Sequence, residues 1–269
     1  MESTHGQGDF MAEVRYGPRP VEQRRSRELE ATQGEVWSQA LTAIYETDPE
    51  VIAAVLPPPL QPPVEPLVRV TITTVEMPGG YTFGAGYFAV RAAHEGTEGE
   101  YPLFMPMTTE QATVGGRETF GEPKKIGEVR ATRDGDAVEG VIARMGFTIV
   151  EIHGRVVETL PTPPERTKTD FYFKFLPAPD GDGFDNDPAL VYCHKQEKAR
   201  LLERVEGDLV LKDSPLDPVA DITVRRVVEI NWCERTTLQR GEIYSRVPAE
   251  SLLPYVHQRY DDLSVLGKP

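Results

Sequence analysis

Short segments in which apolar and polar residues alternate recur along this chain, and they constrain its fold more than any other feature. Val68, Val70 and Ile72 alternate with polar residues, and the segment 171–176 repeats the pattern with three phenylalanines. A period of two places apolar side chains on one face of a β-strand. Strands and helices do not alternate regularly, so a doubly wound parallel sheet is not expected. The pattern predicts a mainly β (α+β) fold, an antiparallel barrel or sandwich.

The same pattern sets the expected elements. We expect strands over residues 68–73, 81–91, 100–107, 138–152, 155–160, 171–176, 190–193, 205–211 and 222–230. A tight turn is expected at His153-Gly154, between two of these strands. A helix is expected to begin at Asp48-Pro49-Glu50, which combines an N-cap residue, a proline at the first helical position and an acid in the first turn. It should end before Pro57, and short helices are expected at 249–253 and 255–263.

The 269 residues suffice for one domain with a sizeable core. Residues 1–30 are polar and contain a group of arginines, so we expect an N-terminal arm followed by a single domain over residues 31–269. The arm is either a solvated tail or a segment that covers a neighbouring surface.

Charge and composition exclude several classes of partner. The net charge of −14 argues against nucleic acids and anionic membranes, and it repels an anionic substrate unless local basic groups compensate. There is no apolar run of about 18 residues and no secretory signal, so a cytoplasmic protein is expected. Two cysteines do not indicate a disulfide framework. No metal or cofactor is expected, because the acidic loop 180–187 lacks calcium-loop spacing and Cys193-His194 with Cys233 lacks zinc-site spacing.

A pair of lysines follows a proline in the segment Gly116–Gly127, as Pro123-Lys124-Lys125. Taken alone, a lysine pair is typical of a solvated surface. Together with the preceding Gly115-Gly116-Arg117-Glu118, however, it resembles the active-site segment of the acetoacetate decarboxylase superfamily. The resemblance covers roughly residues 40–263. It includes 45–60 as an N-terminal helix and its exit, 65–70 as a strand, and Tyr260-Asp261 near the end.

This resemblance implies an antiparallel β-barrel or cone with a few peripheral helices, assembled as a homo-oligomer, a tetramer or larger. It also implies that Lys124 attacks a ketone or oxo acid and forms a Schiff base, so that the chain is a carbon–carbon lyase without a cofactor. A lysine amine attacks only when uncharged, whereas its usual pKa near 10.4 leaves about one in two thousand uncharged at pH 7. Burial and the charge of Lys125 are the two available causes of activation. Neighbours in an extended segment point to opposite sides, so burial is expected to be the larger one.

Three positions depart from the family pattern. Where family decarboxylases carry two glutamates, this chain has Thr71 and Phe83, and the family arginine falls near Trp37-Ser38, although Arg24, Arg25 or Arg27 could reach in from the arm. The resemblance therefore favours aldolase-dehydratase chemistry slightly over decarboxylation of a β-oxo acid. The alternatives are a non-catalytic ligand-binding member of the same fold and a self-assembling structural protein.

A second group must move protons in any of these reactions. Tyr260 and Glu118 are the candidates by analogy. The alternative for Tyr260 is a packing role, and the alternative for Arg117 and Glu118 is a local ion pair that orients the loop. The expected catalytic residues are thus Lys124, Lys125, Glu118 and Tyr260. The residues expected to contact substrate are Arg117, Phe83, Tyr87, Met105 and Phe120, and Phe104 and Met107 are further candidates for the apolar wall.

Overall fold

The computed structural model of the protein describes residues 16–17, 35–77 and 79–267. Val36–Pro269 forms one compact unit, which contains every helix and strand of the described residues. The expected arm over residues 1–30 lies outside the described residues, except for positions 16 and 17, and it stays a prediction together with the domain boundary at residue 31. No helix of the described residues is long and apolar enough to cross a membrane.

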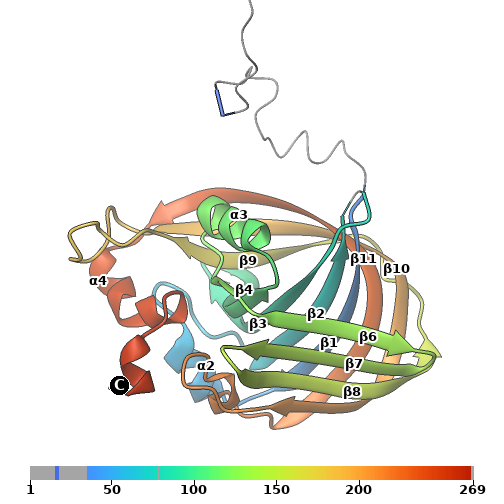
Figure 1. Ribbon diagram of the computed structural model, residues 1–269. Helices are drawn as coiled ribbons and strands as arrows, with labels where there is room; N and C mark the ends of the chain where they lie inside the picture. The colour runs from blue at the N-terminus through green and yellow to red at the C-terminus, as the bar shows by residue number, and fades with distance from the viewer. Residues whose placement is uncertain (1–15, 18–34, 78, 268–269) are drawn as a thin grey trace, which may run out of the picture. The chain divides into compact units, whose positions relative to one another are not determined.

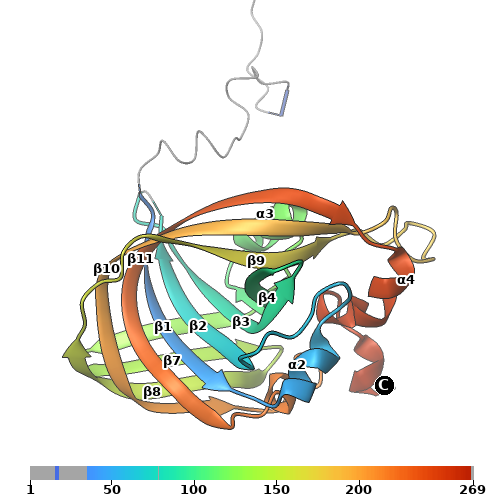
Figure 2. The same cartoon turned by 180° about the vertical axis from the view of Figure 1, so that it is seen from behind.

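Seven strands form a closed ring in which β10 pairs with both β9 and β11 (Figures 1 and 2). All neighbours in this ring are antiparallel except β4 and β9, which join through a short parallel pairing of Glu100 with Asp170. The mainly β fold expected from the alternation and the barrel implied by the family resemblance are therefore confirmed. The ring, in spatial order, consists of β11 (Arg226–Arg246), β1 (Trp37–Glu46), β2 (Leu67–Glu76), β3 (Thr82–His94), β4 (Thr97–Met107), β9 (Arg166–Lys174) and β10 (Ala189–Leu211).

A second limb of the sheet continues from β10 through β8 (Phe147–Thr159), β7 (Ala137–Arg144) and β6 (Glu128–Asp134). These strands cross the outer face of β1, β2 and β3 in Figure 1. Strand β6 contacts β1, β2 and β3, and β7 contacts β1 and β2. The main apolar core fills the space between the two layers and includes Leu41, Ile72 and Ile142, all fully buried. Because this core takes one face of β1–β3, the opposite face of these strands is left for the interior of the ring.

Strands β10 and β11 are longer than expected, with 23 and 21 residues. Strand β10 pairs with β9 along its first half and with β8 along its second half, so it joins the ring to the second limb. Residues 194–204 were not expected to be extended, because charged residues interrupt the apolar alternation there. Two of these charged residues, Lys195 and Glu197, face the interior of the ring.

Three local expectations were wrong. Strand β8 runs through His153-Gly154 without a turn. Gly154 instead permits close approach of β10, because a Cβ atom there would lie 2.5 Å from Val205 Cγ1. The turn before β8 lies at Met145-Gly146, where both residues have positive φ. Tyr45-Glu46 belongs to β1 rather than to a helix, and β11 begins at Arg226, after the short helix η2 (Val219–Asp221).

The helices are peripheral, as expected. Helix α2 (Pro49–Val55) begins directly after Asp48, which confirms that prediction. The C-terminal segment forms α4 (Ala249–Leu252), η3 (Leu253–Gln258) and η4 (Leu263–Leu266).

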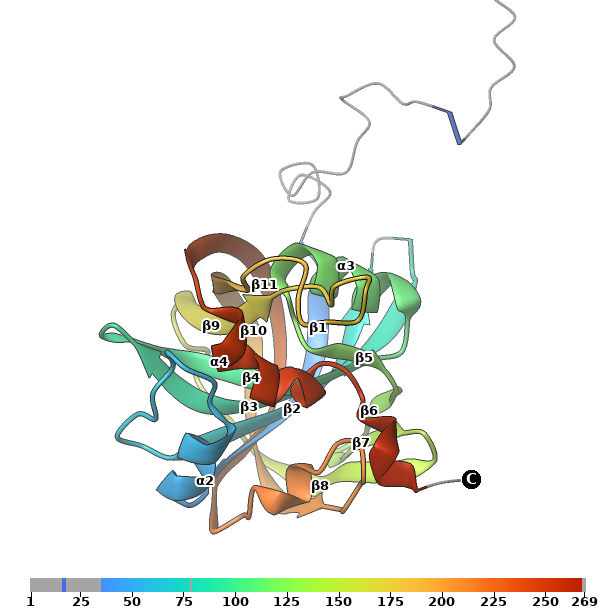
Figure 3. The same ribbon diagram turned by 90° about the vertical axis from the view of Figure 1, so that its left-hand side faces the viewer.

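Helix α3 (Glu110–Phe120) was not predicted, because two central glycines lower its intrinsic helix propensity. The Thr109 side chain accepts a hydrogen bond from Ala112 N at its start, and Gly121, with φ of 83°, ends it. This helix lies beside the short strand β5 (Lys124–Ile126) in Figure 3.

Candidate active site

A cavity of about 260 Å³ lies inside the ring, on the face of the sheet opposite the main core. The alternation along β2 shows how it is built. Val68, Val70 and Ile72 belong to the main core, whereas Arg69, Thr71 and Thr73 line the cavity. The other ring strands contribute in the same way, with side chains at every second position. Cavity-lining residues on these strands include Ser38, Phe83, Tyr87, Met105, Met107, Lys168, Asp170, Lys195, Glu197, Arg235 and Gln239.

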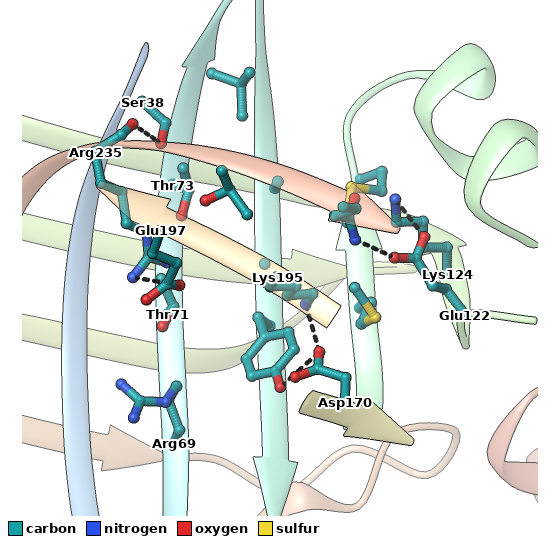
Figure 4. A pocket seen from close by; sticks show the side chains of 18 of the residues that line it. Ser38, Arg69, Thr71, Thr73, Glu122, Lys124, Asp170, Lys195, Glu197 and Arg235 are labelled. Carbon is teal, nitrogen blue, oxygen red and sulfur yellow. Dashed lines mark hydrogen bonds and ion pairs between the residues drawn. The ribbon is translucent and has the colours of Figure 1, made fainter. Parts of the chain in front are cut away.

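Lys124 lies at one side of this cavity, on β5, which pairs in parallel with Met105–Met107 of β4. Its Nζ atom is 2.7 Å from Glu122 Oε2, and the two side chains are 13% and 1% exposed. Gln239 donates a hydrogen bond to Glu122 Oε1 at 3.1 Å. Glu122 Oε2 accepts no hydrogen bond of regular geometry from the described residues. Its close polar contact is the ion pair with the Lys124 ammonium (Figure 4). The amine and the carboxylate are therefore close enough for direct proton transfer.

The glycine before the arginine in the lysine segment has a steric role. Gly116 lies on the face of α3 that covers Lys124 and Glu122. A Cβ atom there would overlap Glu122 Oε2 and lie 2.6 Å from Lys124 Nζ. Only a residue without a side chain lets the helix approach the amine this closely. Helix α3 thus forms a lid of backbone over the Lys124–Glu122 pair.

Arg117 and Tyr260 support this arrangement from outside the cavity. Arg117 Nη1 donates to the carbonyl oxygens of Lys124, at 2.9 Å, and Arg259, at 3.3 Å. Its guanidinium lies over the Tyr260 ring, 4.9 Å from the centroid. Neither residue lines the cavity, and Glu118 is exposed on the outer side of α3. The structure therefore differs from the expectation of a substrate contact for Arg117 and of proton transfer by Tyr260 or Glu118, because the three side chains lie behind the lysine segment.

Lys125 points away from the cavity, as alternation along β5 requires. Its Nζ atom lies 2.8 Å from Asp217 Oδ1 and 3.0 Å from Asp261 Oδ1, and Arg144 pairs with both carboxylates. Burial alone would raise the pKa of Asp261, but hydrogen bonds from Arg144 and Lys125 lower it. The expectation that Lys125 acts at the catalytic amine does not agree with this position. Lys125 instead anchors the lysine strand to the C-terminal segment.

The expected apolar wall is present in part. Phe83, Tyr87, Met105 and Met107 line the cavity. Phe120 does not, because its ring packs against Gly241 on β11, and Phe104 belongs to the main core. The positions at which the chain departs from the family pattern, Ser38, Thr71 and Phe83, all face the cavity. Arg235 pairs in register with Ser38, so an arginine of β11 lies next to the position where the family arginine was expected.

A buried hydrogen-bond network that sequence reasoning missed connects five strands, β2, β3, β4, β9 and β10, in the middle of the cavity. The Tyr87 hydroxyl lies 2.9 Å from Glu100 Oε2 and 3.1 Å from Asp170 Oδ2, and Lys195 Nζ pairs with Asp170. Burial would lower the pKa of Lys195, but Asp170 outweighs it, so the pKa is raised and Lys195 stays charged. Arg69 Nε donates to Glu100 at 2.6 Å. Although burial opposes ionisation, Arg69 and Lys168 hold the pKa of Glu100 down to about 2.

A second missed group surrounds Glu197. Lys168 Nζ lies 2.9 Å from Glu197 Oε2, and Arg235 Nη1 lies 3.5 Å from Glu197 Oε1. Burial would raise the pKa of Glu197, but Arg235 and Lys168 lower it to about 2. Burial and the nearby Arg69 lower the pKa of Lys168 to about 8.

The sequence contains a weak signal for these cavity residues, namely charged residues spaced two positions apart. Glu122 and Lys124 are two residues apart in an extended segment, and this spacing puts both side chains on one face. Lys168 and Asp170, and also Lys195 and Glu197, have the same spacing. Charged residues at alternate positions of a strand normally indicate a solvated face, so the interior location emerges only from ring closure.

The charge balance of the cavity is opposite to that of the chain. Its lining contains the cations Arg69, Lys124, Lys168, Lys195 and Arg235 and the carboxylates Glu100, Glu122, Asp170 and Glu197. With all of these groups ionised the cavity carries one positive charge, whereas the chain carries −14. Local basic groups thus offset the repulsion of an anionic ligand that the net charge predicts.

Comparison with known proteins gives one consistent family. A model of the acetoacetate decarboxylase (ADC) family matches residues 18–247. Acetoacetate decarboxylase from Streptomyces nogalater is 35% identical over 206 residues, which cover 70% of this chain and 78% of the relative. The crystal structure of acetoacetate decarboxylase from Legionella pneumophila subsp. pneumophila str. Philadelphia 1 has a TM-score of 0.69 at 20% identity, over 79% of this chain and 88% of that one. The enduracididine biosynthesis enzyme MppR, in a complex with pyruvate, has a TM-score of 0.69 at 17% identity, over 79% and 90% of the two chains.

Proposed function

The chain belongs to the acetoacetate decarboxylase family, and on this premise we propose that it is a carbon–carbon lyase in which Lys124 forms a Schiff base with an oxo acid or ketone. The observation that carries the proposal is the Lys124 amine at the edge of the cavity inside the ring, 2.7 Å from a buried carboxylate. Schiff-base chemistry needs a lysine with access to a carbonyl and a group that takes and returns its protons.

Glu122 is the proton-transferring group in this proposal. The Lys124 ammonium gives a proton to Glu122 Oε2, and the neutral nitrogen attacks the carbonyl carbon, forming a C–N bond while the C=O π electrons move to oxygen. Glu122 returns its proton to this oxygen, takes a proton from the nitrogen of the carbinolamine and passes it to the hydroxyl. The hydroxyl leaves as water, and a protonated imine remains. Gln239 holds the other carboxylate oxygen and fixes the direction of Glu122. Glu122 thus takes the role expected for Tyr260 or Glu118.

The protonated imine withdraws electrons from the adjacent carbon. The bond from that carbon to a carboxylate or to a hydroxyl-bearing carbon then breaks, and its electron pair forms an enamine. In the first case carbon dioxide leaves; in the second the hydroxyl gives its proton to Glu122 and an aldehyde leaves. The enamine is then protonated, or it attacks an aldehyde in the reverse sense, and water releases the product from Lys124. The replacement of the family carboxylates by Thr71 and Phe83 in the cavity wall favours the aldolase-dehydratase reaction. MppR, which shares the fold, was crystallised with pyruvate and with the condensation product of pyruvate and imidazole 4-carboxaldehyde. These complexes also favour an aldolase-dehydratase reaction for this chain.

A non-catalytic ligand-binding protein of the same fold is the second candidate. The observation that favours it is the ion pair with Glu122, which gives the Lys124 amine a partner within the protein itself. In that case a ligand would occupy the cavity without forming a covalent bond to Lys124.

Borohydride trapping separates the two candidates. The protein is incubated with pyruvate, acetoacetate, acetopyruvate or a larger oxo acid, reduced with borohydride, and digested for mass spectrometry. We expect a reduced adduct on Lys124, its absence in Lys124→Gln, and its persistence in Lys212→Gln, which replaces a half-exposed lysine far along the chain. Carbon dioxide and aldehyde assays on the same panel then identify the reaction. Saturable binding without an adduct on Lys124 would establish the non-catalytic alternative.

Assembly and location complete the proposal. We expect a homo-oligomer, a tetramer or larger, in the cytoplasm. Multi-angle light scattering of the purified chain tests the first point, and a monomer at micromolar concentration would contradict it.

A further inference from the structure

Three cations share two carboxylates at the end of the cavity to which β2, β4, β9, β10 and β11 contribute. Arg69 pairs with Glu100, and Lys168 and Arg235 pair with Glu197. These five residues all line the cavity, and together they carry one positive charge. The side of the cavity that contains Lys124 has no such excess, because Lys124 pairs with Glu122 and Lys195 pairs with Asp170.

Most of the donors of the two arginines remain available. Within the part of the chain that the structure describes, the Arg69 guanidinium donates one hydrogen bond, from Nε to Glu100. The Arg235 guanidinium is 3.5 Å from Glu197 and donates no hydrogen bond to any described residue. Each guanidinium has five N–H groups. Both arginine side chains retain some exposure, 13% and 18%, and both line the cavity, so an anion in the cavity can reach them.

Strand β11 gives the separation between this end and the catalytic amine. Gln239, which contacts Glu122, and Arg235 both line the cavity and lie four residues apart on the same strand. At about 3.4 Å per residue their Cα atoms are about 14 Å apart. In Figure 4 the Lys124–Glu122 pair likewise lies at the opposite side of the view from Arg69, Glu197 and Arg235, with Lys195 and Asp170 between them.

We propose that Arg69, Lys168 and Arg235 form a carboxylate-binding subsite for a part of the substrate that is remote from the carbonyl attacked by Lys124. The inference rests on the proposed function and specifies its substrate class. The substrate is an oxo acid in which several carbon atoms separate the carbonyl from an anchoring carboxylate. That carboxylate is held too far from the imine to be the leaving group, so it anchors the substrate while a different bond is cleaved or formed.

The electrostatics of Lys168 agree with this assignment. Its ammonium faces Arg69 from β2 and Arg235 from β11, and it also faces Glu100 from β4 and Glu197 from β10. Burial and the two arginines lower its pKa to about 8, although the two glutamates oppose this. The three cations therefore face only two carboxylates, and an incoming carboxylate supplies the third negative charge.

A series of methyl ketones tests the proposal by varying only the distance between the carbonyl and the carboxylate. Acetoacetate, 4-oxopentanoate, 5-oxohexanoate and 6-oxoheptanoate differ only in the distance from carbonyl to carboxylate, and their methyl esters lack the charge. The measured quantity is the concentration that gives half-maximal borohydride trapping of Lys124. We expect a longer acid to reach this point at a concentration at least about tenfold below that of acetoacetate and of its own ester.

Substitutions assign the effect to the subsite. Arg235→Gln and Lys168→Gln should remove the advantage of the long acid over its own ester. A circular dichroism spectrum and a melting temperature close to those of the wild-type protein show that each variant is folded. Arg204→Gln, which replaces a half-exposed arginine paired with Glu158 and Glu206, is the matched control and should keep the advantage. Equal trapping of acids and esters in the wild-type protein overturns the subsite while the labelled Lys124 preserves the proposed function. Absence of any label on Lys124 removes both.

The pH dependence provides a readout that a purely structural role would not give. The preference of the wild-type protein for acid over ester should fall as the pH rises through about 8, because Lys168 loses its charge there. Lys168→Arg should hold the preference constant over about one pH unit on either side. A preference of the wild-type protein that does not change over this range would exclude Lys168 from the subsite.

Discussion

The substitution Gly116→Ala tests whether the backbone lid over Lys124 positions the reactive amine. The new Cβ atom would lie 1.9 Å from Glu122 Oε2 and 2.6 Å from Lys124 Nζ, whereas ordinary van der Waals contact begins at 3.4 Å. The carboxylate must therefore move by about 1.5 Å and the amine by about 0.8 Å. A misplacement of about 1 Å in an active site can reduce the rate about 100-fold. We therefore expect the rate of borohydride-dependent labelling of Lys124 to fall by about 30- to 100-fold.

Stability should change much less than labelling. Alanine in a helix interior is about 1 kcal/mol better than glycine, and overpacking costs about 1–3 kcal/mol, so the two effects largely offset one another. The labelling rate is measured at a subsaturating concentration of an oxo acid, and urea unfolding is measured on the same sample. Gly115→Ala is the matched control, because it makes the same chemical change about 100° around the helix. A folded Gly116→Ala protein that is labelled at the wild-type rate would refute the positioning argument.

Three further predictions concern the proton-transferring group, the buried cavity charges and the lysine strand. Glu122→Gln should reduce the labelling rate of Lys124 by at least about 100-fold without unfolding the protein, and a wild-type rate would exclude Glu122 from proton transfer. Glu100 and Glu197, with folded pKa values of about 2 below an ordinary value of 4.5, should add stability that is complete above about pH 4.5 and lost as the pH falls toward 2. The upper limit is about 3 kcal/mol for each, and acid titration of Glu197→Gln by circular dichroism should show a flatter loss. Lys125→Met should destabilise the fold by about 3 kcal/mol or less, because Arg144 still pairs with Asp217. Labelling of the folded fraction of this variant should persist, and its loss would restore a direct role for Lys125.

Some of the site could be predicted because it depends on local sequence. Alternation along 68–73 indicates which residues share a face of the strand, and the structure places Arg69, Thr71 and Thr73 together in the cavity wall. The lysine segment could be identified by its resemblance to a family, and the apolar neighbours Phe83 and Met105 do line the cavity. Helix α3 was missed, because its two glycines lower the helix propensity of the segment. One of them, Gly116, is needed for the close contact with Lys124 and Glu122, which local sequence patterns do not reveal.

The roles assigned by analogy fared less well, for a geometric reason. Arg117, Glu118 and Tyr260 are close to Lys124 in sequence or in the family pattern, but they lie behind the lysine strand. Glu122, by contrast, lies two residues before Lys124 in the sequence. The extended conformation of the segment places both side chains on the same face, where they form an ion pair.

By itself, the sequence determined the strand periodicity, the β character of the fold and the segment that contains the reactive lysine, because these depend on neighbours a few residues apart. Only the tertiary structure decided which face of each strand is the interior. Strand β10 must pair with both β9 and β11 to close the ring, and these pairings join residues that are far apart in sequence. In the sequence Asp170, Lys195 and Arg235 look like surface charges, but closure of the ring makes them part of the polar wall of a cavity. The reason is that the exposure of a side chain on a strand depends on which element packs against that face.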